Sequence, residues 1–199
     1  MLSFPSATKC DFEIGTDKIL KNTTVSENQA KEFRKQINKI SLINKLSQTT
    51  LNAFPGENVT EIEIFHICVK SPDFDSELLK IIDKAIPYHN IFILDSETQF
   101  CIVLSYLNKQ YKTEWTQDIS LTLNGLNLDA IYENFVRQVA GNYIVFDTGN
   151  LSDDVEKSIQ LKKNQKEIDR LEKLARAEKQ PKKKFEIVQK INQLKNKYR

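Results

Sequence analysis

The stretch that decides the fold runs from Val59 to Leu107. It reads VTEIEIFHICVK at 59–70, SPDFDSELLKIIDKAIPYH at 71–89, NIFIL at 90–94 and FCIVLSYL at 100–107. No other stretch of the chain is as apolar, and a core forms where apolar residues concentrate. The rest of the chain is therefore expected to pack around this stretch.

The stretch predicts a β-α-β-β unit. Its first strand carries Glu61 and Glu63 on one face and becomes apolar on both faces after Phe65, as a covered strand does. Pro72 ends that strand, because proline has no N–H to donate. A short helix follows, with Leu78, Leu79, Ile82 and Ala85 at helical spacing. The segments 90–94 and 99–107 then form a hairpin through the loop 95–98. The strand after the helix can run parallel or antiparallel to the first.

The segment before this unit predicts one helix and one strand. Residues 1–24 look irregular, with an extended piece across the core. Ser26 followed by Gln29 is a capping-box pattern, which predicts a helix that begins near Glu27. Residues 39–46 are expected to form a strand.

After the unit, residues 111–115 and 119–123 alternate apolar and polar side chains, which predicts two edge strands of the same sheet. Asn127 is expected to cap a helix that Gly141 ends. Residues 142–147 (NYIVFD) read either as a short strand or as an extended linker.

The composition changes at Ser152, where Lys, Glu, Gln and Leu become dominant. Ser152 followed by acidic residues predicts a helix start there. Pro181 fits the first turn of a second helix and would damage the interior of a continuous one. Two antiparallel helices in a coiled-coil hairpin, turning near residues 180–183, are expected, the first roughly 40 Å long at about 1.5 Å per residue. The apolar positions expected in its seam are Leu161, Ile168, Leu171, Ala175, Ile187, Ile191, Leu194 and Tyr198.

The predicted fold class is therefore α+β, with a mixed or antiparallel sheet and packed helices, followed by a C-terminal α-helical coiled-coil hairpin. The predicted domains are a globular domain over residues 1–150 and a basic helical arm over 151–199. Residues 153–199 hold 15 Lys and Arg against 8 Asp and Glu, a net charge of +7, whereas the remainder carries −5. Such a split is typical of an interaction tail.

The cysteines indicate a reducing compartment. Cys10, Cys68 and Cys101 are odd in number and lack CxxC spacing, and two of them lie in apolar strands, where free thiols behave as small hydrophobes. The sequence shows no secretory signal and no run of eighteen apolar residues. We expect a soluble, cytoplasmic protein without a membrane contact.

Several short sequence segments are similar to those of a known family. They are KLS and TLN in the region 45–52, IDKAIPYH at 82–89 and LNLDAIYENFVRQVAG at 126–141. Through them the whole chain resembles the uncharacterised bacterial proteins grouped as domain of unknown function 4391. The resemblance implies an association with helicases and DNA methyltransferases in restriction-modification or phage-defence clusters. It carries no established active site.

The sequence offers few candidates for catalysis. It has no phosphate-binding GxxxxGK[ST] or GxGxxG loop and no GxSxG elbow. Its Cys and His residues lack zinc-ligand spacing, so we predict no metal and no cofactor. Structural roles are favoured for His66 and His89, the latter being the better functional candidate. Glu61, Glu63, Asp83 and His89 are the weak catalytic candidates, the carboxylates as magnesium ligands. The E-x-K strand motif of restriction-type nucleases is absent.

The basic arm indicates a binding function more strongly than the preceding candidates indicate catalysis, although its lysines also fit the solvated face of a coiled coil. The candidate contacts to nucleic acid or a protein partner are Lys162, Lys163, Lys166, Arg170, Lys182, Lys183, Lys184 and Lys190. We expect a non-enzymatic accessory subunit that binds a protein partner such as a helicase or DNA methyltransferase, with nucleic acid contacted through the arm. The alternatives are a divergent metal-dependent nuclease and a homodimeric scaffold joined by the coiled coil.

Overall fold

A computed structural model describes residues 4–196 of the chain. Tyr198, expected in the helical seam, lies outside the described residues. The chain divides into two compact units, residues 1–141 and 142–199. No helix of the described part is long and apolar enough to cross a membrane.

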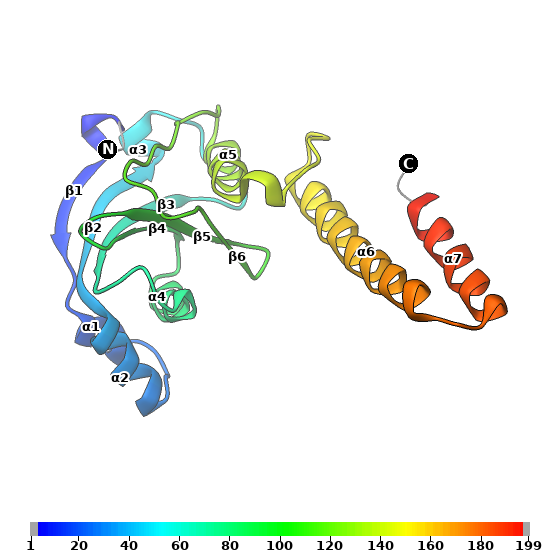
Figure 1. The fold of residues 1–199 in the computed structure, drawn as a ribbon. Coiled ribbons are helices and arrows are strands. Elements are labelled where there is room, and N and C mark those ends of the chain that lie inside the picture. The colour runs from blue at the N-terminus through cyan, green and yellow to red at the C-terminus, as the bar shows by residue number, and fades with distance from the viewer. Residues whose placement is uncertain (1–3, 197–199) are drawn as a thin grey trace. The chain divides into compact units, whose positions relative to one another are not determined.

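The first unit contains a mixed sheet of six strands within the described residues, and the strands lie in chain order (Figure 1). They are β1 (Lys9–Glu13), β2 (Ile37–Ser47), β3 (Glu61–Val69), β4 (His89–Asp95), β5 (Phe100–Tyr106) and β6 (Lys109–Lys112). Strands β3 and β4 pair in parallel and every other neighbouring pair is antiparallel. The α+β class with a mixed sheet is thus confirmed, and the crossover between β3 and β4 proves to be the parallel one.

Helices cover both faces of this sheet (Figure 1). One face carries α1 (Thr16–Lys21), α2 (Glu27–Gln36) and α4 (Leu79–Ala85), and the other carries α5 (Leu128–Ala140). Short pieces complete the unit: η1 (Ser6–Thr8), α3 (Gln48–Leu51), η2 (Ser76–Leu78) and, at the junction with the second unit, η3 (Gly141–Tyr143). The core against α1, α2 and α4 is built on Phe33, Phe65 and Phe92, each fully buried. Burying a side chain of this kind contributes about 1.5–3 kcal/mol.

Caps read from the sequence are present in the structure. The Gln29 N–H donates to Oγ of Ser26, and the Ser26 N–H donates to Oε1 of Gln29, which is the capping box predicted for α2. Asn127 caps α5 by accepting the Ala130 N–H at 2.8 Å, and the helix ends before Gly141 at a φ of 47°, which glycine adopts without strain.

Three local predictions are wrong. The first is a strand at 119–123. The Gln138 side chain of α5 instead accepts the Thr122 N–H at 2.8 Å and donates to its carbonyl at 2.9 Å, so these backbone groups are satisfied without a neighbouring strand. The second is the irregular structure expected for residues 1–24, because this segment contains the helix α1. The predicted edge strand at 111–115 begins earlier, as β6, and ends at Lys112.

The third wrong prediction is Ser152 as the helix cap, although the helix begins next to it, at Leu151, with Asp153 and Asp154 in its first turn as expected. Helix α6 (Leu151–Ala177) is capped by Asn150, whose Oδ1 accepts the Asp153 N–H at 3.1 Å. The carboxylate of Asp154 in its first turn accepts the Thr148 N–H and hydroxyl, which bends the preceding residues into a loop. Residues 142–147 therefore form no strand; η3 runs to Tyr143 and irregular chain follows.

The second unit is the helical arm, which consists of α6 and α7 (Pro181–Asn196). Pro181 is the first residue of α7, as predicted, and the turn between the helices spans residues 178–180. Ile168, Leu171 and Ile191 form the buried seam, with Ile187 and Leu194 packed against it. Lys195 of α7 reaches Glu172 of α6 at 2.8 Å. The helical hairpin is therefore confirmed.

Candidate functional site

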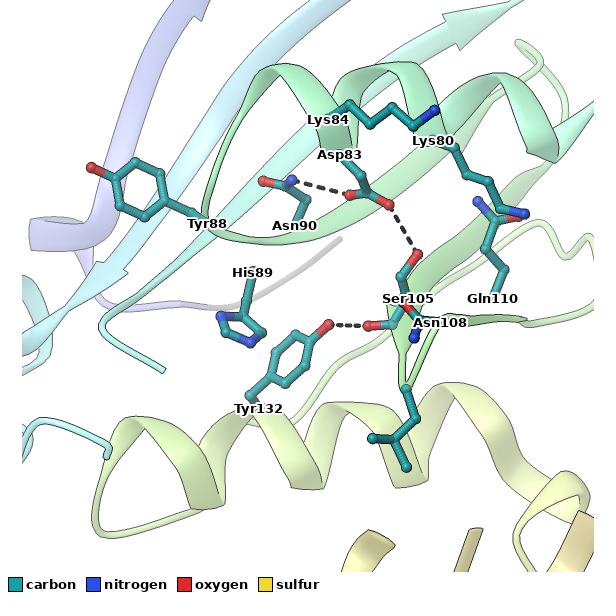
Figure 2. A pocket seen from close by; sticks show the side chains of 11 residues that line it. Lys80, Asp83, Lys84, Tyr88, His89, Asn90, Ser105, Asn108, Gln110 and Tyr132 are labelled. Atoms are coloured by element: carbon teal, nitrogen blue, oxygen red, sulfur yellow. Dashed lines mark hydrogen bonds between the residues drawn. The ribbon is translucent and has the colours of Figure 1, made fainter. Parts of the chain in front are cut away.

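A cavity of about 500 Å³ opens at the end of the sheet where α4 stops and β4 begins (Figure 2). It brings together two of the catalytic candidates, Asp83 from α4 and His89 from β4. Its wall also contains Lys80, Lys84, Tyr88, Asn90, Ser105, Leu107, Asn108, Gln110 and Tyr132. The site is thus built from α4, β4, the β5–β6 hairpin and α5.

Asp83 is held by two side chains from neighbouring strands (Figure 2). Its Oδ1 accepts a hydrogen bond from Nδ2 of Asn90 at 3.0 Å, and its Oδ2 accepts one from the Ser105 hydroxyl at 2.9 Å. Burial raises the pKa of Asp83, and these two hydrogen bonds oppose that effect. Both carboxylate oxygens are therefore engaged within the protein, which suits a positioning role.

His89 lies against Tyr132 of α5, with ring centroids 4.6 Å apart in an edge-to-face arrangement. The Tyr132 hydroxyl donates to the Ser105 carbonyl at 2.6 Å, so the ring of Tyr132 is held by His89 and its hydroxyl by β5. Burial lowers the pKa of His89 and raises that of Tyr132. At neutral pH the site accordingly presents a neutral imidazole and a neutral phenol, and its wall also contains Lys84 and Lys80, the latter paired with Glu77. These groups suit the binding of a small polar or anionic ligand.

The other two catalytic candidates lie together at a different place. Lys45 of β2 is 2.9 Å from Oε1 of Glu61 and 3.7 Å from Oε1 of Glu63, both on β3. Glu63 is 6% exposed, and burial raises its pKa. The first cause of the raised pKa of Lys45 is its hydrogen bond to Glu61. We call these three residues the Lys45 cluster.

Within residues 4–196, Glu61, Glu63 and Asp83 do not form a group close enough to share a metal ion. The structure instead gathers His66 and Cys68 of β3 with Asp95 of β4, one ligand atom of each lying within 4.8 Å of the others. Sequence spacing does not reveal this group, because the sequence predicts Asp95 in a hairpin loop and its position beside Cys68 depends on the register of two strands.

The basic candidates all lie on the arm, and two of them have partners there. Arg170 donates to both oxygens of Glu167 at 2.7 Å, and Nζ of Lys162 is 3.7 Å from the centroid of the Tyr143 ring. The remaining candidates, Lys163, Lys166, Lys182, Lys183, Lys184 and Lys190, are exposed. Lys182, Lys183 and Lys184 occupy the first turn of α7, beside the turn of the hairpin.

The fold and these sites define a class: an α+β domain with a mixed sheet covered by helices on both faces, followed by a basic two-helix arm. The family described as Domain of unknown function (DUF4391) matches residues 2–197, and the chain belongs to that family. Searches of the curated proteins and of the solved structures find no match.

Proposed function

We propose that this protein is a non-enzymatic, partner-binding subunit whose arm docks on a larger protein. The observation that carries the proposal is a set of exposed apolar side chains at the turn end of the arm. Phe185 is 63% exposed, Leu174 44% and Val188 39%. We call these three residues the arm patch.

The internal packing of the arm is thin. Among its described residues, the seam cluster contains three buried apolar side chains with two more packed against it. In proteins most of the stability of a helix comes from tertiary packing of its apolar face rather than from helix propensity. Covering the arm patch would bury further apolar surface at about 25 cal/mol per Å², so a docked arm is more stable than a bare one.

The charges around the arm patch describe the expected partner. Lys182, Lys183 and Lys184 directly precede Phe185, and Lys173 directly precedes Leu174. A complementary surface therefore has an apolar pocket with acidic residues at its rim, because such a rim pairs with lysines and excludes other partners. The family resemblance makes a helicase or DNA methyltransferase of a restriction or phage-defence system the partner class to test first.

The experiment is an affinity purification from cells that carry the native gene cluster. We compare the full chain, a truncated chain that ends at Asn150, and a variant with Phe185→Ser and Val188→Ser. The matched control carries Gln189→Ser and Asn192→Ser, two exposed polar positions on the same helix. The proposal expects a helicase or methyltransferase with the full chain and the control, and its loss with the other two.

Other outcomes would point elsewhere. Equal recovery with the truncated chain would move the docking surface to the first unit. A mass in solution of twice the chain, lost in the Phe185→Ser, Val188→Ser variant, would support the homodimeric scaffold. Retention on DNA that disappears with Lys182→Ala, Lys183→Ala and Lys184→Ala, and falls steeply with salt, would support a nucleic-acid contact instead.

The Lys45 cluster supports a second candidate, a metal-dependent nuclease. An E-x-K motif places its lysine on the same strand as its carboxylate, whereas here β2 supplies the ammonium group to Glu61 and Glu63 of β3. In such an enzyme Glu61 and Glu63 would be the Mg²⁺ ligands and Lys45 the cation that stabilises charge on a phosphate. Magnesium-dependent nicking of plasmid DNA, abolished by Glu61→Ala and retained by Glu77→Ala, would favour this function. Inactivity with every divalent metal would eliminate it.

A further inference from the structure

Three side chains that commonly bind zinc meet at the C-terminal ends of β3 and β4. Sγ of Cys68 is 3.8 Å from Nδ1 of His66, and Nε2 of His66 is 2.9 Å from Oδ2 of Asp95. One ligand atom of each residue lies within 4.8 Å of the other two. The imidazole thus has a thiol at one nitrogen and a carboxylate at the other.

Strand geometry explains the arrangement. Residues two apart on a strand point to the same face, so His66 and Cys68 stand side by side. The parallel register pairs Cys68 with Asp95, which brings the carboxylate across from the neighbouring strand. Neighbouring strands lie about 4.8 Å apart, which lets the Asp95 carboxylate reach the His66 ring. Two rigid central strands therefore hold the group.

The group borders a cavity of about 610 Å³. His66 and Asp95 line it, together with Cys10 of β1 and Asp118 of the segment after β6. The side chain of His66 is 30% exposed and that of Asp95 20%. A metal ion in solvent therefore has a path to His66 and Asp95.

The group of His66, Cys68 and Asp95 also resembles two other arrangements. A Cys–His–Asp set is also the constellation of a nucleophilic thiol with its base. The alkylation rate of Cys68 distinguishes that role from metal binding, because a nucleophilic cysteine has a lowered pKa and reacts fast. A plain His66–Asp95 hydrogen bond would explain two of the three residues but gives no role to the adjacent thiol.

We propose that His66 and Cys68 bind a zinc ion through Nδ1 and Sγ, while the carboxylate of Asp95 accepts the Nε2–H of His66. This hydrogen bond is the partner that metal-bound imidazoles usually have, and it fixes the ring orientation and raises its basicity. On binding, the Cys68 thiol releases its proton to solvent and the resulting thiolate becomes the ligand. Water completes the tetrahedral coordination.

The test uses the purified full chain and cobalt(II) as the metal, with zinc as competitor. Cobalt bound by a thiolate gives a charge-transfer absorption that zinc removes on displacement. We expect one equivalent of cobalt, with tighter binding at pH 8 than at pH 6.5 because a proton is released. Cys68→Ser should abolish the charge-transfer band, and Asp95→Asn should weaken metal affinity by roughly 10–100-fold. Cys101→Ser, a buried thiol of β5, is the matched control and should bind as the unaltered protein does.

Circular dichroism of each variant shows whether it is folded. If Cys68→Ser does not fold, the test uses Asp95→Asn, which preserves the shape of the site. An unchanged cobalt spectrum in Cys68→Ser would overturn the proposal, as would the absence of stoichiometric binding. Fast alkylation of Cys68 by iodoacetamide at pH 7, in a protein that binds no metal, would also overturn it and assign the thiol as a nucleophile.

Discussion

The carboxylate of Asp129, in the first turn of α5, accepts the backbone N–H of Val59 at 2.7 Å through Oδ1. Its Oδ2 accepts the N–H of Glu57, also at 2.7 Å, and Asn58 adds a third donor. One side chain thus ties the loop before β3 to the start of a helix far along the chain. These backbone groups have no strand partner, so the carboxylate replaces a hydrogen-bond ladder.

Replacing Asp129 by Ala should lower the free energy of unfolding by about 2–3 kcal/mol, because hydrogen bonds to a charged group are lost and backbone donors are left without partners. Urea unfolding at pH 7 measures the change. Asp73→Ala, an exposed carboxylate of the loop before α4, is the control and should change stability by no more than about 0.5 kcal/mol. Equal effects of both substitutions would show that the Asp129 bonds contribute little.

Gly56 lies so close to this carboxylate that a side chain does not fit. A Cβ at this position would be 2.4 Å from Oδ1 of Asp129 and 2.7 Å from the Val59 carbonyl oxygen. Gly56→Ala should therefore cost about 1–3 kcal/mol, as overpacking does. The comparison is Gly15→Ala, where a Cβ meets nothing within 4 Å and the expected change is near zero. Thermal melts of both variants measure the two changes in stability. A Gly56→Ala protein as stable as the unaltered one would contradict the close approach of Gly56 to the Asp129 carboxylate.

Burial of His89 makes stability depend on pH. Because its pKa is lowered in the folded state, the unfolded chain binds a proton that the folded chain does not, once the pH falls below about 6.5. The free energy of unfolding contributed by this residue is therefore lost as pH falls from about 6.5 through the folded pKa. The charges of Asp129 and Asp83 reduce the effect.

His89→Gln removes this titration, so its loss of stability between pH 7 and pH 5 should be smaller than that of the unaltered protein. Urea midpoints at pH 7, 6 and 5 for both proteins measure the difference. Every other titrating group, Asp83 included, is common to the two. Parallel curves would mean that His89 is protonated equally in the folded and unfolded states.

The thin seam makes the arm sensitive to single truncations. Ile191 is 5% exposed, so Ile191→Ala should destabilise the arm by about 2–5 kcal/mol and lower the helical signal in circular dichroism. Val188→Ala on the same helix removes atoms that are already 39% exposed and should leave the helical signal intact. Trypsin should cut the Ile191→Ala arm much faster. If both variants resist equally, the seam is not what holds the two helices.

The sequence predicts elements well where a cap or a breaker marks them. Asn127 and Gly141 bound α5 as expected, and Pro181 begins α7, because each residue acts on its own backbone neighbours. The wrong strand at 119–123 has the opposite origin. Its alternation is real, but the Gln138 side chain from α5 satisfies the backbone of Thr122, and no local pattern reveals a partner that distant.

The candidate sites follow the same rule. Asp83 and His89 were predicted individually and share a cavity, yet the cavity depends on Ser105 and Tyr132, which carried no signal in the sequence. The Lys45 cluster and the proposed zinc ligands both join neighbouring strands. Their members become neighbours through strand order and register, and a shift of one residue would turn the side chains to opposite faces.

The two edges of the sheet have a practical consequence. Strand β1 is short, its register slips between Lys9 and Phe12, and its side chains are mostly exposed; β6 has four residues and begins and ends with lysine. Irregular, charged edges resist the addition of a foreign strand, which is how many β-containing proteins begin to aggregate. Precipitation of this protein at high concentration should therefore start at exposed apolar side chains outside the sheet, such as Leu126, Phe54 and Phe185, and polar residues there are the first changes to make for crystallisation.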